Sequence, residues 1–396
     1  MELTSSLKQL GQRYRFPEDW LQARPYLFSA AKVQLPAKTQ AEISAVIEAI
    51  ESVIKLPAYQ EEVLSWAPDI ARFDPGISGV FFGYDFHLSP EGIKLIEINS
   101  NAGSAALAAL LNMAQAKEQP LLTQQHEHWE TNFAEMFLNE WRTKRGDQAL
   151  SCVAIVDENP TEQYLYPDFL LFQFALQQQG IKTVIVDPKE LSLKCGQLYH
   201  HETLISLVYN RLTDFSLGEP AHQALKEAYL LDAIVLTPHP RSHACYADKR
   251  NLTVLSNTTL LRSWGVSESQ LALLTHSIPR VYNVDPSHAE ELWEMRKQLF
   301  FKPVAGYGGK GAYRGAKMSR RVFNDILQAN YVAQTFIPAS EQTVNVAGEA
   351  QTFKLDVRCY VYESKPIGMI ARLYQGQVTN MRTPGGGFAV VEFEVP

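Results

Sequence analysis

Three oxygen-bearing side chains, Asp85, Glu97 and Asn99, stand on either side of a short turn-like segment at 89–92. Side chains alternate along a strand, so Glu97 and Asn99 share one face, and the turn brings Asp85 to the same end. Two carboxylates and an amide oxygen form a hard oxygen cluster suited to Mg²⁺ carrying phosphates. A solvated polar face of a hairpin is the alternative, although the apolar neighbours of these residues speak against it.

A glycine-rich loop follows a strand-like segment in the last third of the chain. Lys302 lies in that segment, and the loop contains Gly306, Gly308, Gly309 and Lys310. Glycines let backbone N–H groups approach an anion, and successive N–H groups can surround a phosphate. The spacing matches neither a Walker A loop nor a dinucleotide-binding fingerprint. The pattern predicts another kind of phosphate site, with a flexible hairpin carrying solvated lysines as the alternative.

Arginines gather beyond this loop. Asp356 and Arg358 alternate along one predicted strand, Arg372 lies on the next, and Asn380 and Arg382 precede three glycines. Arginines beside a phosphate loop can hold a transferring phosphoryl group or an acyl phosphate. Cross-strand ion pairing, which stabilises a protein only slightly at a surface, is the alternative.

Periodic apolar patterns predict the elements that must position these residues. The first part of the chain predicts helices and one hairpin: a helix at 40–66, strands at 80–86 and 94–98, and a helix at 104–116. The middle predicts a strand–helix–strand unit with two more strands: 152–157, 166–179, 182–187, 204–209 and 233–236. The last part alternates helices at 286–298 and 317–329 with strands at 299–304, 331–336, 353–362 and 366–374, before an extended end at 384–393. The fold class is therefore α/β or α+β, with several lobes.

Composition limits the class of protein. The chain has 396 residues, 46% hydrophobic and 20% charged, which suggests two or three domains and excludes wholesale disorder. A net charge of −7 argues against a protein that coats nucleic acid. Four scattered cysteines indicate neither a zinc site nor a disulfide framework, and we find no signal peptide or bilayer-spanning apolar run. We expect a soluble cytoplasmic protein that binds neither nucleic acid nor membrane.

The separate motifs together resemble the ATP-grasp ligases, and bacterial glutathione synthetase in particular. The matching segments are Ala247-Asp248-Lys249, Lys302-Pro303 with Gly308-Gly309, Ala333-Gln334, Asp356-Val357-Arg358, Ala371-Arg372-Leu373, and Asn380 with 385–387. Glu97-Ile98-Asn99 is displaced to the front, an order similar to that of glutathionylspermidine synthetase and its relatives. Such a circular permutation is tolerated when the chain ends lie close together. The chain departs from those relatives at Gly83, where they have an arginine, and at 101–104.

The resemblance implies a circularly permuted ATP-grasp fold with a Rossmann-like βαβ domain of the kind called pre-ATP-grasp. It divides the chain into an N-terminal helical region at 1–77, a metal-binding hairpin with helices at 78–150, a substrate domain at 151–245 and nucleotide-binding lobes at 246–396.

The resemblance also implies a role for each candidate residue. The nucleotide ATP would be bound by Lys249, Lys302, Gly306, Gly308, Gly309, Lys310, Gln334, Phe336, Ile337 and Asp356. Asp85, Glu97 and Asn99 would hold one or two Mg²⁺ or Mn²⁺ ions. Arg358, Arg372, Asn380 and Arg382 would stabilise the transferring group. The implied reaction joins a carboxylate to an amine, on small molecules or peptides, through an acyl phosphate with release of ADP and phosphate. The resemblance is also compatible with a homodimer.

Other functions stay open at this point: a small-molecule kinase of the same fold, a nucleotide-binding protein without turnover, and a dinucleotide-binding oxidoreductase. The complete set of charged candidates speaks against the second, and the missing glycine fingerprint after Val156 speaks against the third. Arg211 and Asp214 are candidate substrate contacts, with a surface ion pair as the alternative. We expect the histidines at 200–201, 239 and 243 to be solvated.

Overall fold

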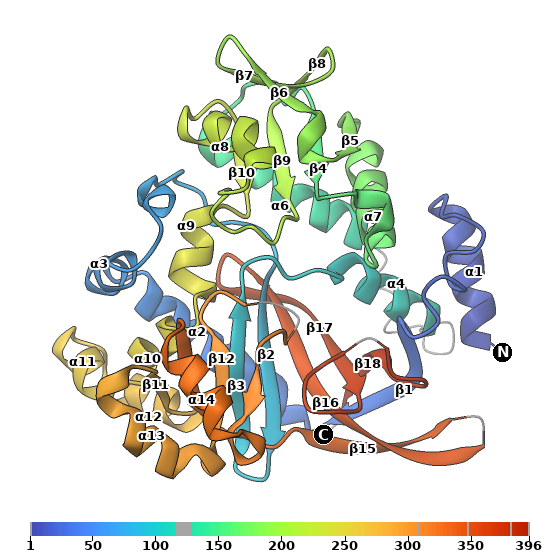
Figure 1. Cartoon of the computed structure of the whole chain (residues 1–396). Helices are drawn as coiled ribbons and strands as arrows, with labels where there is room; N and C mark the ends of the chain where they lie inside the picture. Colours follow the sequence, from blue (N-terminus) through green and yellow to red (C-terminus); the bar gives the residue numbers. More distant parts are fainter. Residues whose placement is uncertain (1, 116–127, 307–308, 347, 381, 395–396) are drawn as a thin grey trace.

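One large sheet joins the two ends of the chain. The computed structural model describes residues 2–115, 128–306, 309–346, 348–380 and 382–394. Within them the sheet runs in the order β1 (Phe28–Leu35), β18 (Gly387–Phe393), β17 (Lys365–Tyr374), β16 (Glu349–Tyr362), β2 (Phe82–Ser89) and β3 (Gly92–Asn99), with β15 (Ser340–Val346) paired to β16. The pair β1–β18 is parallel, and the other neighbours are antiparallel. In Figure 1 the cyan hairpin β2–β3 therefore lies beside the red strands of the C-terminal segment.

Three smaller sheets surround this one. A parallel sheet contains β10 (Val235–Thr237), β9 (Leu207–Asn210), β4 (Val153–Val156) and β5 (Thr183–Val186). An antiparallel sheet contains β11 (Val281–Asn283), β14 (Tyr331–Thr335), β12 (Leu299–Pro303) and β13 (Tyr313–Arg314). The small antiparallel sheet β6 (Leu191–Lys194), β7 (Gln197–His200) and β8 (Thr203–Ile205) lies beside the parallel sheet at the top of Figure 1.

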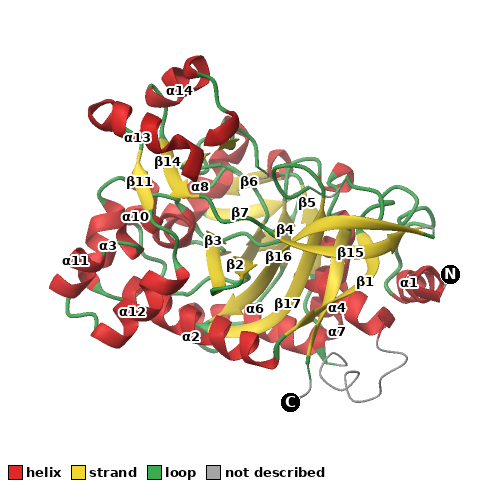
Figure 2. Cartoon of the chain, turned by 90° about the horizontal axis from the view of Figure 1, so that it is seen from below, coloured by secondary structure: helices red, strands yellow, loops and turns green. Residues whose placement is uncertain are grey.

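Helices cover both faces of the large sheet (Figure 2), and others pack against the smaller sheets. Their bounds are α1 (Glu2–Arg13), α2 (Ala37–Ile54), α3 (Pro57–Leu64), α4 (Ala105–Gln115), α6 (Trp129–Arg145), α7 (Tyr166–Gln178), α8 (Gln223–Leu230), α9 (Pro240–Ser242), α10 (Asn251–Leu255), α11 (Thr258–Ser263), α12 (Glu268–Ser277), α13 (Ala289–Met295) and α14 (Arg320–Leu327). Side chains alternate along β17, so Ile370 packs in the core that contains α4, whereas Ala371 and Leu373 pack in the core that contains α2.

Two expectations about the N-terminal part differ from the structure. The predicted single helix at 40–66 is two helices, because Leu56 is extended before Pro57 and proline favours the first position of a new helix. The region 1–77, expected to be helical, also contains β1, which completes an edge of the large sheet. The other predicted boundaries between parts stay predictions.

Across the described ranges, the helices are too short or too polar to traverse a lipid bilayer.

Candidate functional site

A cavity of about 470 Å³ opens where the large sheet, the β12–β14 sheet and the parallel sheet meet. This volume lies within the range typical of small-molecule sites. Most predicted site residues line the cavity: Asp85, Glu97, Asn99, Lys249, Lys302, Gly306, Gly309, Lys310, Gln334, Phe336, Ile337, Asp356, Arg358 and Arg372. Asn380 and Arg382 stand outside this lining set, and Gly308 lies outside the described residues.

The hairpin places the three predicted oxygen ligands together. Asp85 on β2 lies directly opposite Glu97 on β3, and Asn99 lies opposite Gly83 at the same end. Asn99 Nδ2 donates a hydrogen bond of 3.1 Å to Asp85 Oδ2. A β-bulge between Asp85 and Phe86 sets this register, because the pairs from Ser89–Gly92 to Phe86–Leu95 would by themselves place Asp85 opposite Ile96.

Two arginines from the C-terminal strands hold Asp85. Arg358 lies beside it across β16 and β2, and donates from Nε to Oδ1 at 2.6 Å and from Nη2 to Oδ2 at 2.7 Å. Arg372 Nη2 donates to the same Oδ2 at 2.8 Å, and its Nε donates to Asp356 Oδ1. Burial by itself raises the pKa of Asp85, but the two guanidinium groups outweigh it and hold that pKa well below its ordinary value.

These contacts decide which carboxylate can take a cation without rearrangement. A carboxylate has about four acceptor positions, and Asp85 already accepts from Asn99 and from three arginine N–H groups. The Glu97 side chain is 29% exposed and lies 4.0 Å from Lys249 Nζ. Glu97 with the amide of Asn99 therefore suits a hard cation such as Mg²⁺, and Asp85 fits only if an arginine gives way.

Two lysines, one just before α10 and one on β12, face this hairpin. Lys302 is 7% exposed and donates to Ile96 O at 3.0 Å and to Gln334 Oε1 at 2.7 Å. Burial lowers the pKa of Lys302 to about 8, with Glu97 opposing and Lys249 reinforcing that shift. Lys249 Nζ donates to Gly306 O at 2.8 Å, at the start of the glycine loop. Both ammonium groups are thus fixed at the cavity wall.

The glycine loop packs against a second loop, where a larger residue would not fit. Gly309 has a φ of +69°, and a Cβ there would lie 2.9 Å from Val378 Cβ. Gln377, Val378 and Thr379 line the cavity opposite the loop. Thr379 Oγ1 also donates to Asp356 Oδ2 at 2.6 Å, which ties this second loop to the arginine network.

One end of the cavity carries an unsatisfied polar group among aromatic and apolar side chains. Gln334 Nε2 is buried and has no hydrogen-bond partner among the described residues. The rings of Phe300 and Phe336 are nearly parallel, with centroids 6.3 Å apart. A ligand or an ordered water would supply the partner that this buried donor lacks.

Comparison with solved structures identifies the fold. Over 98% of both chains, the protein aligns with a glutathione synthetase-like effector from Globodera pallida at 10% identity and a TM-score of 0.59. It aligns with a putative gamma-glutamylcysteine synthetase from Methylobacillus flagellatus at 11% identity and a TM-score of 0.51, over 88% of this chain and 86% of that one. The chain has an ATP-grasp-type fold. At identities this low, the structural similarity shows the fold alone. The circular permutation stays a prediction.

Sequence comparisons add nothing to this likeness, since no family model and no curated protein matches the sequence. A further structure, the ATP-grasp ligase PsnB with a minimal precursor, aligns over 62% of this chain and 90% of that one, at 13% identity and a TM-score of only 0.32.

The structure gives a local reason for glycine at position 83, where the sequences that this chain resembles have an arginine. A Cβ at Gly83 would lie 2.6 Å from Ala102 Cβ and 3.2 Å from Arg358 Nε. A side chain there would collide with the segment after β3 and with the arginine that holds Asp85. Glycine at this position therefore leaves space for Arg358.

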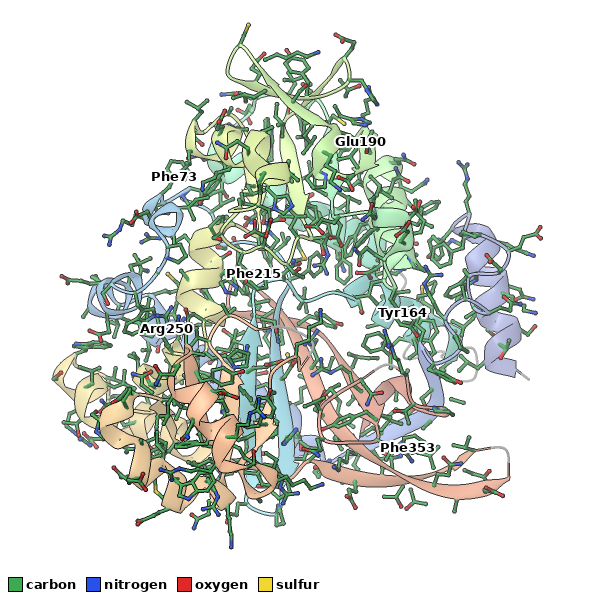
Figure 3. All side chains as sticks on the ribbon, viewed as in Figure 1. Phe73, Tyr164, Glu190, Phe215, Arg250 and Phe353 are labelled. Atoms are coloured by element: carbon green, nitrogen blue, oxygen red, sulfur yellow. The ribbon has the colours of Figure 1, made fainter. Side chains whose placement is uncertain are left out.

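Several residues of the cavity were not predicted as site residues. Those with polar side chains include His87, Asn101, Ser104, Tyr164 and Thr379. His87 lies two positions after Asp85 on β2, so strand alternation could have indicated it. Its Nδ1 lies 3.0 Å from Ile337 O, and burial lowers its pKa. Tyr164, labelled in Figure 3, lies between the segment that carries α7 and the large sheet, and no motif in the sequence indicates it.

Of the two candidate substrate contacts, Arg211 and Asp214, only Arg211 lines the cavity. It follows β9 in the chain. Asp214 instead closes its own loop, since it accepts from the backbone N–H groups of Ser216 and Glu219 and lies 2.8 Å from His222 Nδ1. Asn380 likewise closes a loop, because its Nδ2 donates to Gln375 O at 2.7 Å.

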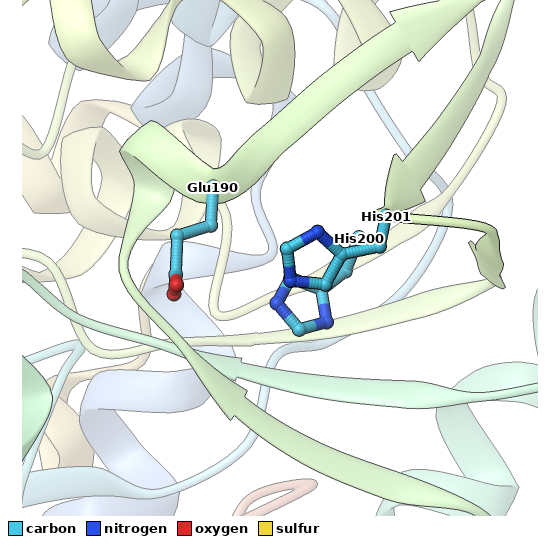
Figure 4. Close-up of side chains that lie close together, drawn as sticks. All are labelled: Glu190, His200 and His201. Atoms are coloured by element: carbon cyan, nitrogen blue, oxygen red, sulfur yellow. The ribbon is translucent and has the colours of Figure 1, made fainter.

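The histidines have two kinds of environment. Glu190, His200 and His201 form a partly exposed cluster on the β6–β8 sheet (Figure 4), where Glu190 already accepts from the Asp187 N–H. The expectation of solvated histidines is wrong for His239, which is buried and accepts from Ser242 N at 3.1 Å. His243 stacks on Phe215 with 3.8 Å between ring centroids.

Proposed function

We propose that this protein is an ATP-dependent ligase that joins a carboxylate to an amine. The convergence of two sets of residues in one cavity supports this proposal most strongly. The C-terminal segment contributes the glycine loop, two lysines and two arginines, and the N-terminal hairpin contributes Glu97, Asn99 and Asp85. The ATP-grasp-type fold agrees with it.

The chemistry of the cavity suits a magnesium nucleotide. Lys249 and Lys302 would neutralise phosphate charge, and the unpartnered Nε2 of Gln334 would donate to the base. We further propose that the backbone from Gln334 to Ile337 borders the adenine. Glu97 and Asn99 are the residues that would hold Mg²⁺, with Asp85 joining after exchange from its arginines. Bound there, Mg²⁺ would screen the charge of the phosphates.

The proposed reaction has two steps. An oxygen of the substrate carboxylate attacks the γ-phosphorus of ATP, and the bond from that phosphorus to the bridging oxygen breaks, giving an acyl phosphate and ADP. The amine nitrogen then attacks the carbonyl carbon, the carbon–oxygen bond to phosphate breaks, and the nitrogen loses a proton. Arg358 and Arg372 would stabilise the charge on the transferring phosphoryl group. The glycine loop would shield the acyl phosphate from water.

The test is a substrate screen scored by mass. Purified protein with Mg²⁺, ATP and panels of acids and amines should form ADP, phosphate and a condensation product lighter than its substrates by one water. Formation of AMP and pyrophosphate would contradict the mechanism. A product heavier by one phosphoryl group would show that the protein is a kinase.

A further inference from the structure

A buried arginine, whose Nε has no partner among the described residues, lines the cavity on the side of the parallel sheet. Arg211 is 7% exposed, and its guanidinium donates to Asn101 Oδ1 and, at 3.4 Å, to Tyr209 Oη. The Nε atom itself is buried. Among the described residues Arg211 also forms no ion pair within 4.0 Å. Burying a charge is costly unless an opposite charge accompanies it, so the site is incomplete as it stands.

The surrounding residues hold this arginine in place. Its guanidinium carbon lies 5.3 Å from the Tyr209 ring centroid and 6.0 Å from that of Phe169. Its backbone N–H donates to Val156 O at 2.9 Å. A Cβ at Gly103 would lie 2.7 Å from Nη2, so glycine there leaves space for the guanidinium. The side chain is therefore pre-positioned for a ligand rather than folded against solvent.

The nearest acids are engaged elsewhere. Asp168 accepts from the backbone N–H groups of Ser104 and Leu107 at the start of α4. Asp157 accepts from the backbone N–H of Glu158 at 2.9 Å. Burial raises the pKa of both carboxyl groups, that of Asp157 to about 6, and the positive charge of Arg211 only partly opposes this. Neither acid supplies the contact that the guanidinium lacks.

We propose that Arg211 binds a carboxylate of one of the two substrates that the ligase joins. This proposal rests on the proposed function, and it names a substrate class. A planar guanidinium with a free Nε matches a carboxylate by paired hydrogen bonds. One substrate therefore carries a carboxylate apart from the group that reacts, as an amino acid or a dicarboxylic acid does. A polyamine would place its positive charge against Arg211 and is rejected at this end of the cavity.

Calorimetry with three probes of equal chain length tests the site: glutarate, its neutral diamide glutaramide, and cadaverine. The full chain should bind glutarate and neither of the others. Arg211→Met should weaken glutarate binding at least ten-fold, Arg211→Lys should weaken it less, and the exposed control Arg262→Met should leave it unchanged. Gly103→Ala keeps every charge and displaces the guanidinium, so it should also weaken binding if Arg211→Met does not fold.

Failure of this proposal is distinct from failure of the ligase proposal. Absence of glutarate binding to the unmodified protein, equal binding of glutaramide, or an unchanged affinity in Arg211→Met would overturn the carboxylate site. Arg211-dependent binding of glutarate together with no ADP formation in the substrate screen would support the site and overturn the ligase.

Discussion

Asp85 and Arg358 lie 273 positions apart in the chain and form a two-point ion pair, with 2.6 Å between Nε and Oδ1 and 2.7 Å between Nη2 and Oδ2. The contact exists because β2 and β16 are neighbours in one sheet. Arg372 shares the same carboxylate. Asp85, which is buried, is thus the counter-ion of two partly buried arginines as well as a candidate metal ligand, so its loss should affect both folding and activity.

The first prediction concerns Asp85→Asn. Removing one partner of a buried ion pair leaves uncompensated charge and typically costs about 3–5 kcal/mol. We expect the free energy of unfolding, measured by urea titration, to fall by roughly that amount at pH 7. Glu97→Gln is the matched control, because Glu97 is partly exposed and its closest ion pair is 4.0 Å long. A loss below about 1 kcal/mol in Asp85→Asn would contradict the role of Asp85 as counter-ion.

The second prediction concerns the activity of Glu97→Gln. The substitution keeps the size of the side chain and removes the charge that would hold Mg²⁺. Loss of an outer-shell partner alone costs about 10–100-fold, so loss of a direct ligand should lower ADP formation by more than about 100-fold. Circular dichroism should show an unchanged fold. An active Glu97→Gln enzyme would remove Glu97 from the metal site.

The β-bulge that places Asp85 opposite Glu97, instead of Ile96, is not visible in the sequence pattern. The hairpin itself could be predicted from local sequence, because turn residues at 89–92 separate two strand-like segments. The engagement of Asp85 by Arg358 could not, since it depends on which distant strand lies beside β2. The same limit applies to β1, whose partner β18 lies at the other end of the chain.

Residues in loops were the least predictable part of the site. Asn380 belongs to a motif that the resemblance places at the site, yet its amide closes its own loop, whereas Thr379 next to it lines the cavity. Which side chain of a loop faces a cavity depends on backbone turns that the sequence pattern does not specify. Arg211 and Asp214 were equal candidates in the sequence, and only the structure separates them, because Arg211 lines the cavity whereas Asp214 closes its own loop.

The third prediction concerns Lys302, whose pKa burial lowers to about 8. The ammonium is charged below that pH and loses its proton above it, so its attraction for phosphate fades as the pH rises. We expect the affinity for a non-hydrolysable ATP analogue, measured by calorimetry, to fall between pH 7.5 and about 9.5, with bound phosphate moving the midpoint upward.

Two variants isolate that effect. Lys302→Met should bind the analogue about 10–100-fold more weakly at pH 7.5, because it loses a hydrogen bond from a charged group. Its affinity should then change little with pH. Lys302→Arg keeps its charge throughout this range and should also show a flat profile. A fall of equal size in all three proteins would assign the pH dependence to another group.

Glu140 is a buried acid between three parts of the fold. Its Oε2 accepts from the Gly79 N–H at 2.9 Å and the Thr237 hydroxyl at 3.2 Å, and its Oε1 accepts from the Tyr362 hydroxyl at 3.2 Å. Burial raises the pKa of Glu140 to about 7, although these three hydrogen bonds oppose it. The folded protein therefore holds a proton that the unfolded chain releases near its ordinary pKa of 4.5.

The fourth prediction is that Glu140→Gln stabilises the protein at high pH. Between about pH 4.5 and 7 the folded state binds more protons than the unfolded state, so the free energy of unfolding falls as the pH rises, by at most about 3 kcal/mol from this group. Glutamine carries no proton to lose. Its oxygen can accept from Gly79 and Thr237, and its NH₂ can donate to the Tyr362 oxygen, because that hydroxyl can donate to Met136 O instead. Urea titrations should therefore give equal stabilities near pH 4.5 and a more stable Glu140→Gln variant at pH 8. The exposed control Glu135→Gln should follow the unmodified protein, and a Glu140→Gln variant that retains the full pH dependence would refute the assignment.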